Sequence, residues 1–251
     1  MRILAFNCSP RAEHSNTERI LKPLLDGARE AGAETETVYV SKEKLGPCRG
    51  CMSCMFRTPG ECVQKDDRAA LAERFERADV AVFGTPVFVF SMSAHMKKLL
   101  ERLIFPMVRP YYVKVGDGFG HPVRDGGDPT KMLLVANGGF WGEQNFAPLE
   151  ASVRQLCDAG VVDDGRPVSE YAGSILVGNG VLLEAPGVGY PLRPFFEKLK
   201  AAGAELAADG ALSDETQESL RAPLWTYLGM DEEQALASIN DHIRQMEPAS
   251  D

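Results

Sequence analysis

The chain has 251 residues, of which 44% are hydrophobic and 25% charged, as in an ordinary globular protein and unlike a disordered or fibrous one. Its net charge of −9 argues against binding along a nucleic-acid backbone or on an anionic membrane, because both need a basic face. No stretch approaches the roughly 20 apolar residues of a membrane span, and the first residues show no signal peptide, so we expect a cytoplasmic protein with neither nucleic acid nor membrane as partner.

Short apolar runs alternate with longer amphipathic segments through residues 1–210, which is typical of parallel βαβ units. Strands are expected at 2–7, 36–40, 80–85, 131–137 and 174–178. Helices are expected at 17–31, 67–77, 94–105, 147–159 and 192–208. The sequence therefore predicts a flavodoxin-like α/β fold, a doubly wound parallel sheet of five strands with helices on both faces.

The first expected strand is followed by a polar loop that opens directly into a helix. Short polar side chains and one cation line this loop: Ser9, Arg11, Ser15, Asn16 and Thr17. A helix N-terminus presents unpaired amides and a partial positive charge, so the loop is a candidate for binding a monophosphate. The alternative is ordinary N-capping of the helix by Ser15 or Asn16.

The most specific local pattern is a group of four cysteines separated by two, two and seven residues: Cys48, Cys51, Cys54 and Cys62. Closely spaced thiolates on a loop can converge on one centre, and four of them suit a [4Fe-4S] cluster or a tetrahedral zinc ion. Free or reversibly oxidised thiols are the third interpretation. Cys8 and Cys157 are expected to be packing residues.

Two apolar loops follow the third and fourth expected strands. The first begins with Thr85, Pro86, Val87 and Phe88, and the second contains Asn137, Gly138, Gly139 and Trp141. Aromatic rings can stack on a flat heterocycle, and glycines permit close backbone approach. Ligands of doubly wound sheets bind at the carboxyl ends of the strands, so one polar and two apolar loops predict a flavin mononucleotide site there. The alternative for residues 85–93 is a buried hydrophobic turn.

The combination of Cys-Ser-Pro-Arg with Ser-Asn-Thr, and then Thr-Pro-Val-Phe, resembles the NADPH-dependent FMN reductase and iron-sulfur flavoprotein branch of the flavodoxin superfamily over residues 1–200. The resemblance implies that the first loop holds the FMN phosphate through Ser9, Arg11, Ser15, Asn16 and Thr17. It implies that Pro86, Val87, Phe88, Asn137 and Gly138 hold the ring. It also implies a homodimer or homotetramer with the flavin pocket at a subunit boundary, and a compact cysteine motif like that of iron-sulfur flavoproteins.

Two segments lie outside the five strands and five helices expected above. Residues 106–129 form an excursion rich in Gly, Pro and aromatics, and residues 214–246 could form two short helices. We therefore expect a flavodoxin-like domain at 1–210 and a helical extension at 211–251, packed on the domain or on a partner subunit. Lys97, Lys98 and Arg102 are expected on a solvated helix face, and Asp66 and Asp67 at the cap of the second helix.

These features predict an FMN-dependent oxidoreductase. It would pass electrons from NAD(P)H or a ferredoxin to a small acceptor such as a quinone or a flavin, through a [4Fe-4S] cluster if the cysteines bind one. FMN supplies the chemistry, so no catalytic side chain is expected. One alternative is a cluster-free NAD(P)H reductase of FMN or quinones, and the other is a non-enzymatic redox sensor whose thiols switch a surface loop.

Overall fold

The computed structural model describes residues 1–124, 130–185, 187 and 189–246. Its centre is a sheet of five parallel strands in the order β2-β1-β3-β6-β7. The strands are β1 (Arg2–Asn7), β2 (Glu34–Tyr39), β3 (Val80–Pro86), β6 (Thr130–Asn137) and β7 (Ser169–Val177). This is the flavodoxin-like strand order, so the predicted fold class is confirmed.

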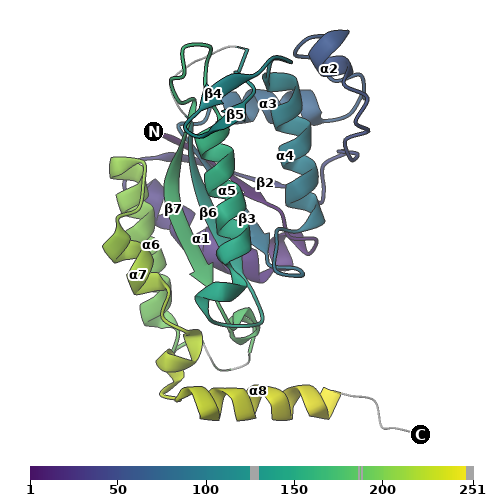
Figure 1. Ribbon diagram of the computed structural model, residues 1–251. Helices are drawn as coiled ribbons and strands as arrows, with labels where there is room; N and C mark the ends of the chain where they lie inside the picture. Colours follow the sequence, from purple (N-terminus) through teal and green to yellow (C-terminus); the bar gives the residue numbers. More distant parts are fainter. Residues whose placement is uncertain (125–129, 186, 188, 247–251) are drawn as a thin grey trace, which may run out of the picture.

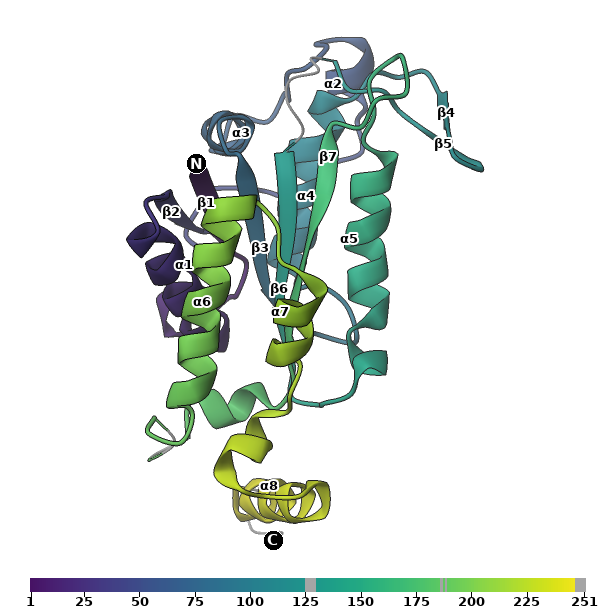
Figure 2. The ribbon, with the colours of Figure 1, turned by 90° about the vertical axis from the view of Figure 1, so that its left-hand side faces the viewer.

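Helices cover both faces of the sheet (Figures 1 and 2). One face carries α1 (Asn16–Glu30) and α6 (Arg193–Asp209), and the other carries α3 (Arg68–Glu76), α4 (Ala94–Met107) and α5 (Ala147–Ala159). Strand side chains alternate between the two faces, so Ile3 of β1 packs with α1 while Leu4 packs with the opposite layer. Burial on both faces explains why the strands read as continuous apolar runs.

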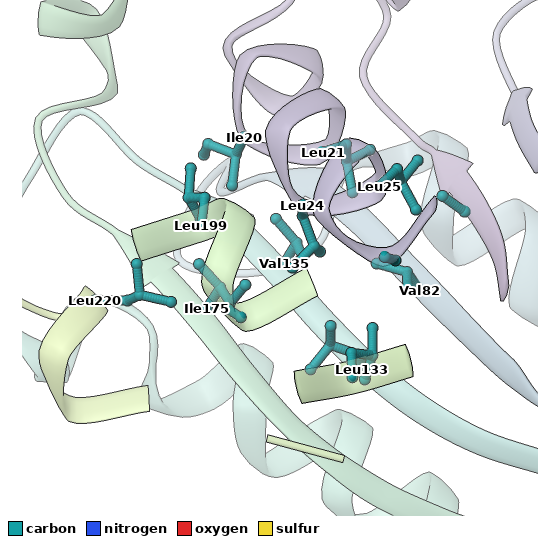
Figure 3. Packing of buried hydrophobic residues seen from close by; sticks show 14 of the residues in the cluster. Ile20, Leu21, Leu24, Leu25, Val82, Leu133, Val135, Ile175, Leu199 and Leu220 are labelled. Atoms are coloured by element: carbon teal, nitrogen blue, oxygen red, sulfur yellow. The ribbon is translucent and has the colours of Figure 1, made fainter. Parts of the chain in front are cut away.

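The layer of α1 and α6 is packed unusually closely. Leu24 of α1 and Leu199 of α6 meet above Val135 of the sheet (Figure 3). A Cβ atom added to Gly203 would lie 1.8 Å from the carbonyl oxygen of Leu24, and one added to Gly27 would lie 1.9 Å from that of Lys200. The two helix backbones therefore touch at these glycines, where no larger residue fits.

The last strand begins earlier than predicted, at Ser169 in place of position 174. Its register with β6 shifts between Met132 and Leu134, and Gly173 has a positive φ of 110° at this point. A glycine at a register shift weakens the sequence signal for a strand, because it has no side chain to pack and marks an irregular backbone.

The excursion after α4 contains a short antiparallel hairpin, β4 (Val113–Val115) with β5 (Gly118–Gly120). The helix α4 itself runs two residues further than predicted, through Pro106 to Met107. The last residues of the expected excursion, 125–129, lie outside the described part of the chain.

The C-terminal segment forms α7 (Asp214–Leu220), the 3-10 helix η4 (Leu224–Leu228) and α8 (Glu232–Met246). Gln217 of α7 donates to the carbonyl of Leu212 and accepts the amide of Ser174 in β7, so α7 closes the edge of the sheet. The helix α8 extends away from the body beyond the carboxyl ends of the strands (Figure 1). Within the described residues, every helix is too short or too polar to cross a membrane.

We expect Gly203→Ala to lower the free energy of unfolding by about 2 kcal/mol. Alanine normally favours a helix over glycine by about 1 kcal/mol, but here its methyl group would force two backbones apart. Urea unfolding followed by circular dichroism measures the change. The control is Ala201→Ser on the exposed face of the same helix, which should stay within about 0.5 kcal/mol of the wild type. A neutral or stabilising Gly203→Ala would contradict the close helix contact.

Candidate functional site

The polar loop after β1 is tied to two strand ends at the N-terminus of α1. Ser15 caps the helix, since its Oγ accepts the amide of Glu18 at 3.1 Å and the Nδ2 group of Asn7 at 3.4 Å. Asn137, at the end of β6, donates its Nδ2 group to Thr17 Oγ1 at 2.8 Å in a buried hydrogen bond. These bonds fix the first turn of α1, whose leading amides have no acceptor within the helix.

Two more of the expected phosphate ligands lie in this loop. Ser9 is buried, and its Oγ accepts the amide of Arg11 at 3.3 Å. Asn16 has a buried Oδ1 atom without a hydrogen-bond partner among the described residues. Asn16 is the first residue of α1, so it lies beside the leading amides, where anions bind.

Arg11 already has a partner in the structure. Its guanidinium makes a two-pronged ion pair with Glu184, which follows the 3-10 helix η3 (Gly180–Leu183) after β7. The sequence analysis did not identify Glu184. An anion bound at this loop would have to compete with its carboxylate for Arg11.

The loop after β3 ends in a strained turn. Phe88 and Ser91 pair through two backbone hydrogen bonds of 3.0 and 3.1 Å, with Val89 and Phe90 at φ angles of 51° and 61° between them. Two successive left-handed residues make a type I′ turn, where Asn-Gly is the usual sequence. A β-branched residue is disfavoured in this region of backbone space, so Val89, which is 92% exposed, is strained at the tip of the loop.

The two aromatic residues of the loop after β6 have different surroundings. Trp141 donates its Nε1 hydrogen to Glu232 of α8 at 2.6 Å and meets Trp225 edge-on at 6.4 Å. It therefore joins the C-terminal segment to this loop, while Phe140 beside it is 68% exposed. A Cβ atom on Gly139 would meet nothing within 4 Å, so the backbone there is open to a ligand.

The structure brings these three loops together at one edge of the sheet. Asn137 joins the third loop to the first through Thr17, and its carbonyl accepts the amide of Val87 from the second at 2.7 Å. Ser93, the N-cap of α4, donates its hydroxyl to the carbonyl of Cys8 at 2.7 Å, and its amide donates to Thr85 Oγ1 at 3.0 Å. One polar and two apolar loops are thus linked by hydrogen bonds at this end of the sheet.

The cysteine loop, residues 45–67 between β2 and α3, lies at the opposite end of the molecule. Figure 1 shows its short helix α2 (Ser53–Phe56) beyond the amino ends of the strands. The sequence predicted only an irregular loop here. Arg124 donates to the carbonyls of Cys54 and Met55 at 3.3 Å each, and so fastens this helix to the excursion after α4.

Arg102 corrects the expectation of a solvated helix face. Lys97 is exposed as predicted, but Arg102 is 2% exposed and reaches into the cysteine loop. Its Nη1 and Nη2 groups donate to the two carboxylate oxygens of Asp66 at 2.7 and 2.8 Å, and Nη2 also donates to Cys62 Sγ at 3.5 Å. Burial acts to raise the pKa of Asp66, but hydrogen bonds from Arg102 and two backbone amides outweigh it and lower that pKa below its ordinary value.

Asp66 and Asp67, the expected caps of α3, bind the cysteine loop as well as lying at the start of the helix. Asp67 occupies the N-cap position without a side-chain capping bond, and its carboxylate accepts the amide of Lys44 at 2.6 Å. Asp66 accepts the amide of Arg68 at 3.3 Å while it holds Arg102. The pair therefore fastens the cysteine loop more than it caps the helix.

The four clustered cysteines are not joined in disulfides. Burial raises the pKa of Cys54, and the neighbouring Cys62, Cys48 and Cys51 raise it further, so the four side chains share one region. In the part of the chain that the structure describes, no three His, Cys, Asp or Glu side chains are grouped closely enough to hold one metal ion. The metal site thus stays a prediction. Cys8 and Cys157 are buried, as predicted, and burial raises the pKa of Cys157 to about 12.

A cavity of about 710 Å³ lies beside the cysteine loop, far from the three converging loops. Phe105, Met132 and Leu156 give it apolar walls, and Arg68 also lines it. Two lining residues, Arg124 and Thr130, flank the segment outside the described residues. A smaller polar hollow of about 480 Å³ lies at the N-terminus of α1, next to Glu184.

Comparison with known proteins places these features in context. The sequence model for NADPH-dependent FMN reductase matches residues 1–144. An iron-sulfur flavoprotein of Methanosarcina thermophila is 35% identical over 183 residues, which cover 63% of this chain and 94% of that protein. An iron-sulfur flavoprotein of Archaeoglobus fulgidus is 32% identical over 140 residues, and the match spans 53% of this chain but only 62% of that protein.

Among solved structures, an FMN-dependent NADH-azoreductase from Bacillus anthracis, in complex with FMN, superposes with a TM-score of 0.58. It is 14% identical and covers 82% of this chain and 99% of the other. At that identity the likeness supports the flavodoxin-like fold and no more.

We expect Val89→Asn to raise the free energy of unfolding by about 1 kcal/mol, because asparagine tolerates the left-handed backbone and the exposed valine loses no packing. Denaturant titration measures the change. The matched control is Val181→Asn in η3, which is also exposed but has an ordinary φ. Equal effects at both positions would show that Val89 is not strained.

Proposed function

Because the chain belongs to the NADPH-dependent FMN reductase family, we propose that it binds FMN where its three loops converge and passes electrons from NAD(P)H to a small acceptor. The convergence of one polar and two apolar loops at the carboxyl edge carries this proposal. Doubly wound sheets bind their ligands at the carboxyl ends of the strands. The polar loop suits the phosphate of FMN, and the two apolar loops suit its ring.

The phosphate end of FMN is proposed to lie at the N-terminus of α1. The net charge of −9 repels a phosphate, so the attraction must come from positively charged and N–H groups close to the bound phosphate. The first-turn amides of α1 supply donors, and Arg11 can exchange Glu184 for the phosphate. The ligands proposed from the sequence are Ser9, Arg11, Ser15, Asn16 and Thr17.

The ring end is proposed to lie against the two apolar loops, held by Thr85, Pro86, Val87, Phe88, Asn137, Gly138 and Gly139. Trp141 would support this end of the site indirectly, because its hydrogen bond to Glu232 holds the loop after β6 against α8. When bound, FMN would supply hydride acceptance and electron transfer, so the side chains around it need only orient the ring and limit access of water. The exposed Phe88, Phe90 and Phe140 at this edge favour a pocket completed by a second subunit, in a homodimer or homotetramer.

We propose further that Cys48, Cys51, Cys54 and Cys62 bind a [4Fe-4S] cluster. Two relatives with at least 32% identity are iron-sulfur flavoproteins, and four cysteines near one another on one loop fit that cluster. The cluster gives a route to a one-electron partner such as a ferredoxin. A cluster-free reductase is the second candidate, because no three His, Cys, Asp or Glu side chains among the described residues are close enough together to hold one metal ion.

The first measurement is the visible spectrum of anaerobically purified protein, with FMN, iron, sulfide and zinc stoichiometries. We expect flavin bands, a broad iron-sulfur absorbance and about four irons per chain. Flavin with steady NAD(P)H oxidation but without iron would establish the cluster-free reductase. No flavin after reconstitution with FMN would contradict the central proposal and favour a thiol sensor.

We expect Thr17→Val to weaken FMN binding about tenfold. The substitution removes the Thr17 hydroxyl, which accepts from Asn137 and is therefore free to donate its hydrogen to the phosphate. A hydrogen bond to a charged group contributes about 1.5–3 kcal/mol, and 1.4 kcal/mol is a tenfold change in affinity. Fluorescence titration of the apoprotein with FMN measures the dissociation constant. Ser152→Ala on the exposed face of α5 is the control and should bind FMN like the wild type. Unchanged binding by Thr17→Val would place the phosphate elsewhere.

A further inference from the structure

Arg102 is the cation most deeply placed beside the cysteine loop. It projects from the third turn of α4, and its side chain is 1% exposed. Its guanidinium donates to the carbonyl of Gly46 at 2.8 Å as well as to Asp66 and Cys62, so it contacts both ends of the cysteine loop. Arginine stays protonated at any ordinary pH, which makes this a permanent buried charge.

Asp66 fixes the direction of that charge. Its two carboxylate oxygens accept from both terminal nitrogens of Arg102, in the fork-to-fork geometry of a strong ion pair. The same carboxylate accepts the amides of Gly46 at 3.2 Å and Arg68 at 3.3 Å, so it cannot turn away. The guanidinium therefore points one N–H group at the sulfur of Cys62 and keeps it there.

We propose that Arg102, clamped by Asp66, is a positioning residue for Cys62 that raises the reduction potential of the cluster. The inference rests on the proposed four-cysteine cluster. Hydrogen bonds to the sulfurs and the net charge nearby are two of the factors that set the potential of an iron-sulfur cluster. Reduction adds one electron, and a fixed positive charge and an N–H donor beside a ligand sulfur stabilise that added negative charge.

The location of the pair makes the effect larger than that of surface charges. Interactions between exposed charges are weakened by water and salt, whereas buried charges are screened much less. Lys97 on the same helix shows the contrast, because its side chain is 63% exposed and pairs with Glu101 in solvent.

Because Arg102 and Asp66 carry opposite charges, neutralising each of them should shift the reduction potential of the cluster in opposite directions. Arg102→Gln removes the cation and leaves the carboxylate of Asp66 facing the cluster, so the potential should fall. Asp66→Asn removes the negative charge and leaves the guanidinium, so the potential should rise. Each change should be about tenfold in the one-electron reduction equilibrium, which corresponds to about 59 mV. Arg102→Lys keeps the charge and should lie closer to the wild type than Arg102→Gln.

The experiment is an anaerobic redox titration of the holoprotein, followed by electron paramagnetic resonance of the cluster, with iron and FMN counted for each variant. Lys97→Gln is the control for loss of one positive charge from α4 and should leave the potential unchanged. Opposite shifts in Arg102→Gln and Asp66→Asn support the inference, since a general loss of folding would lower the iron content of both variants without opposite shifts.

Iron-loaded variants whose potentials equal that of the wild type, or shift in the same direction, would overturn the role of Arg102 and leave the cluster in place. If Arg102→Gln does not fold, Asp66→Asn and Arg102→Lys decide the matter, because a potential that does not rise in Asp66→Asn is sufficient to reject it. A wild-type chain that takes up no iron would overturn the cluster and this inference together, while FMN binding would stand.

Discussion

Helices cover the parallel sheet on both faces, and this constraint governs where the protein can bind a ligand. With both faces buried, ligands can approach the sheet at the ends of its strands, and all five carboxyl ends lie on one side. Three loops meet there through hydrogen bonds among Asn137, Thr17 and Val87. Each loop follows directly from a strand, so the sheet positions all three.

The helix α4 connects that surface with the cysteine loop. At its N-terminus, Ser93 caps the helix and donates to the carbonyl of Cys8 in the polar loop. Nine residues further along, Arg102 holds the cysteine loop, and a helix of that length rises about 14 Å. This helix therefore sets the separation between the two regions that are proposed to bind redox groups. A movement of the cysteine loop along α4 would break the pair of Arg102 with Asp66.

In this acidic chain, one arginine in each of the two proposed cofactor regions is paired with a nearby carboxylate. Arg11 and Arg102 lie in the two proposed cofactor regions, and each is held by a carboxylate, Glu184 and Asp66 respectively. The two pairs differ in burial, since the side chain of Arg11 is half exposed while that of Arg102 is buried. An incoming anion can compete for the first cation, whereas the second is a permanent part of the structure.

The sequence by itself determined the elements that depend on local pattern. Continuous apolar runs marked β1, β3 and β6, helical spacing marked α1, α4 and α5, and the parallel alternation of these elements placed the three loops at one edge. What the pattern did not reveal are contacts between residues distant along the chain. Arg102 looked like one more cation on a solvated helix until the fold brought Asp66, 36 positions away, beside it. Arg11 meets Glu184 at a separation of 173 residues, and Trp141 meets Glu232 at 91. Periodicity encodes which face of an element is apolar, but the partner of a single polar side chain depends on how the layers pack, and only the tertiary structure decided that.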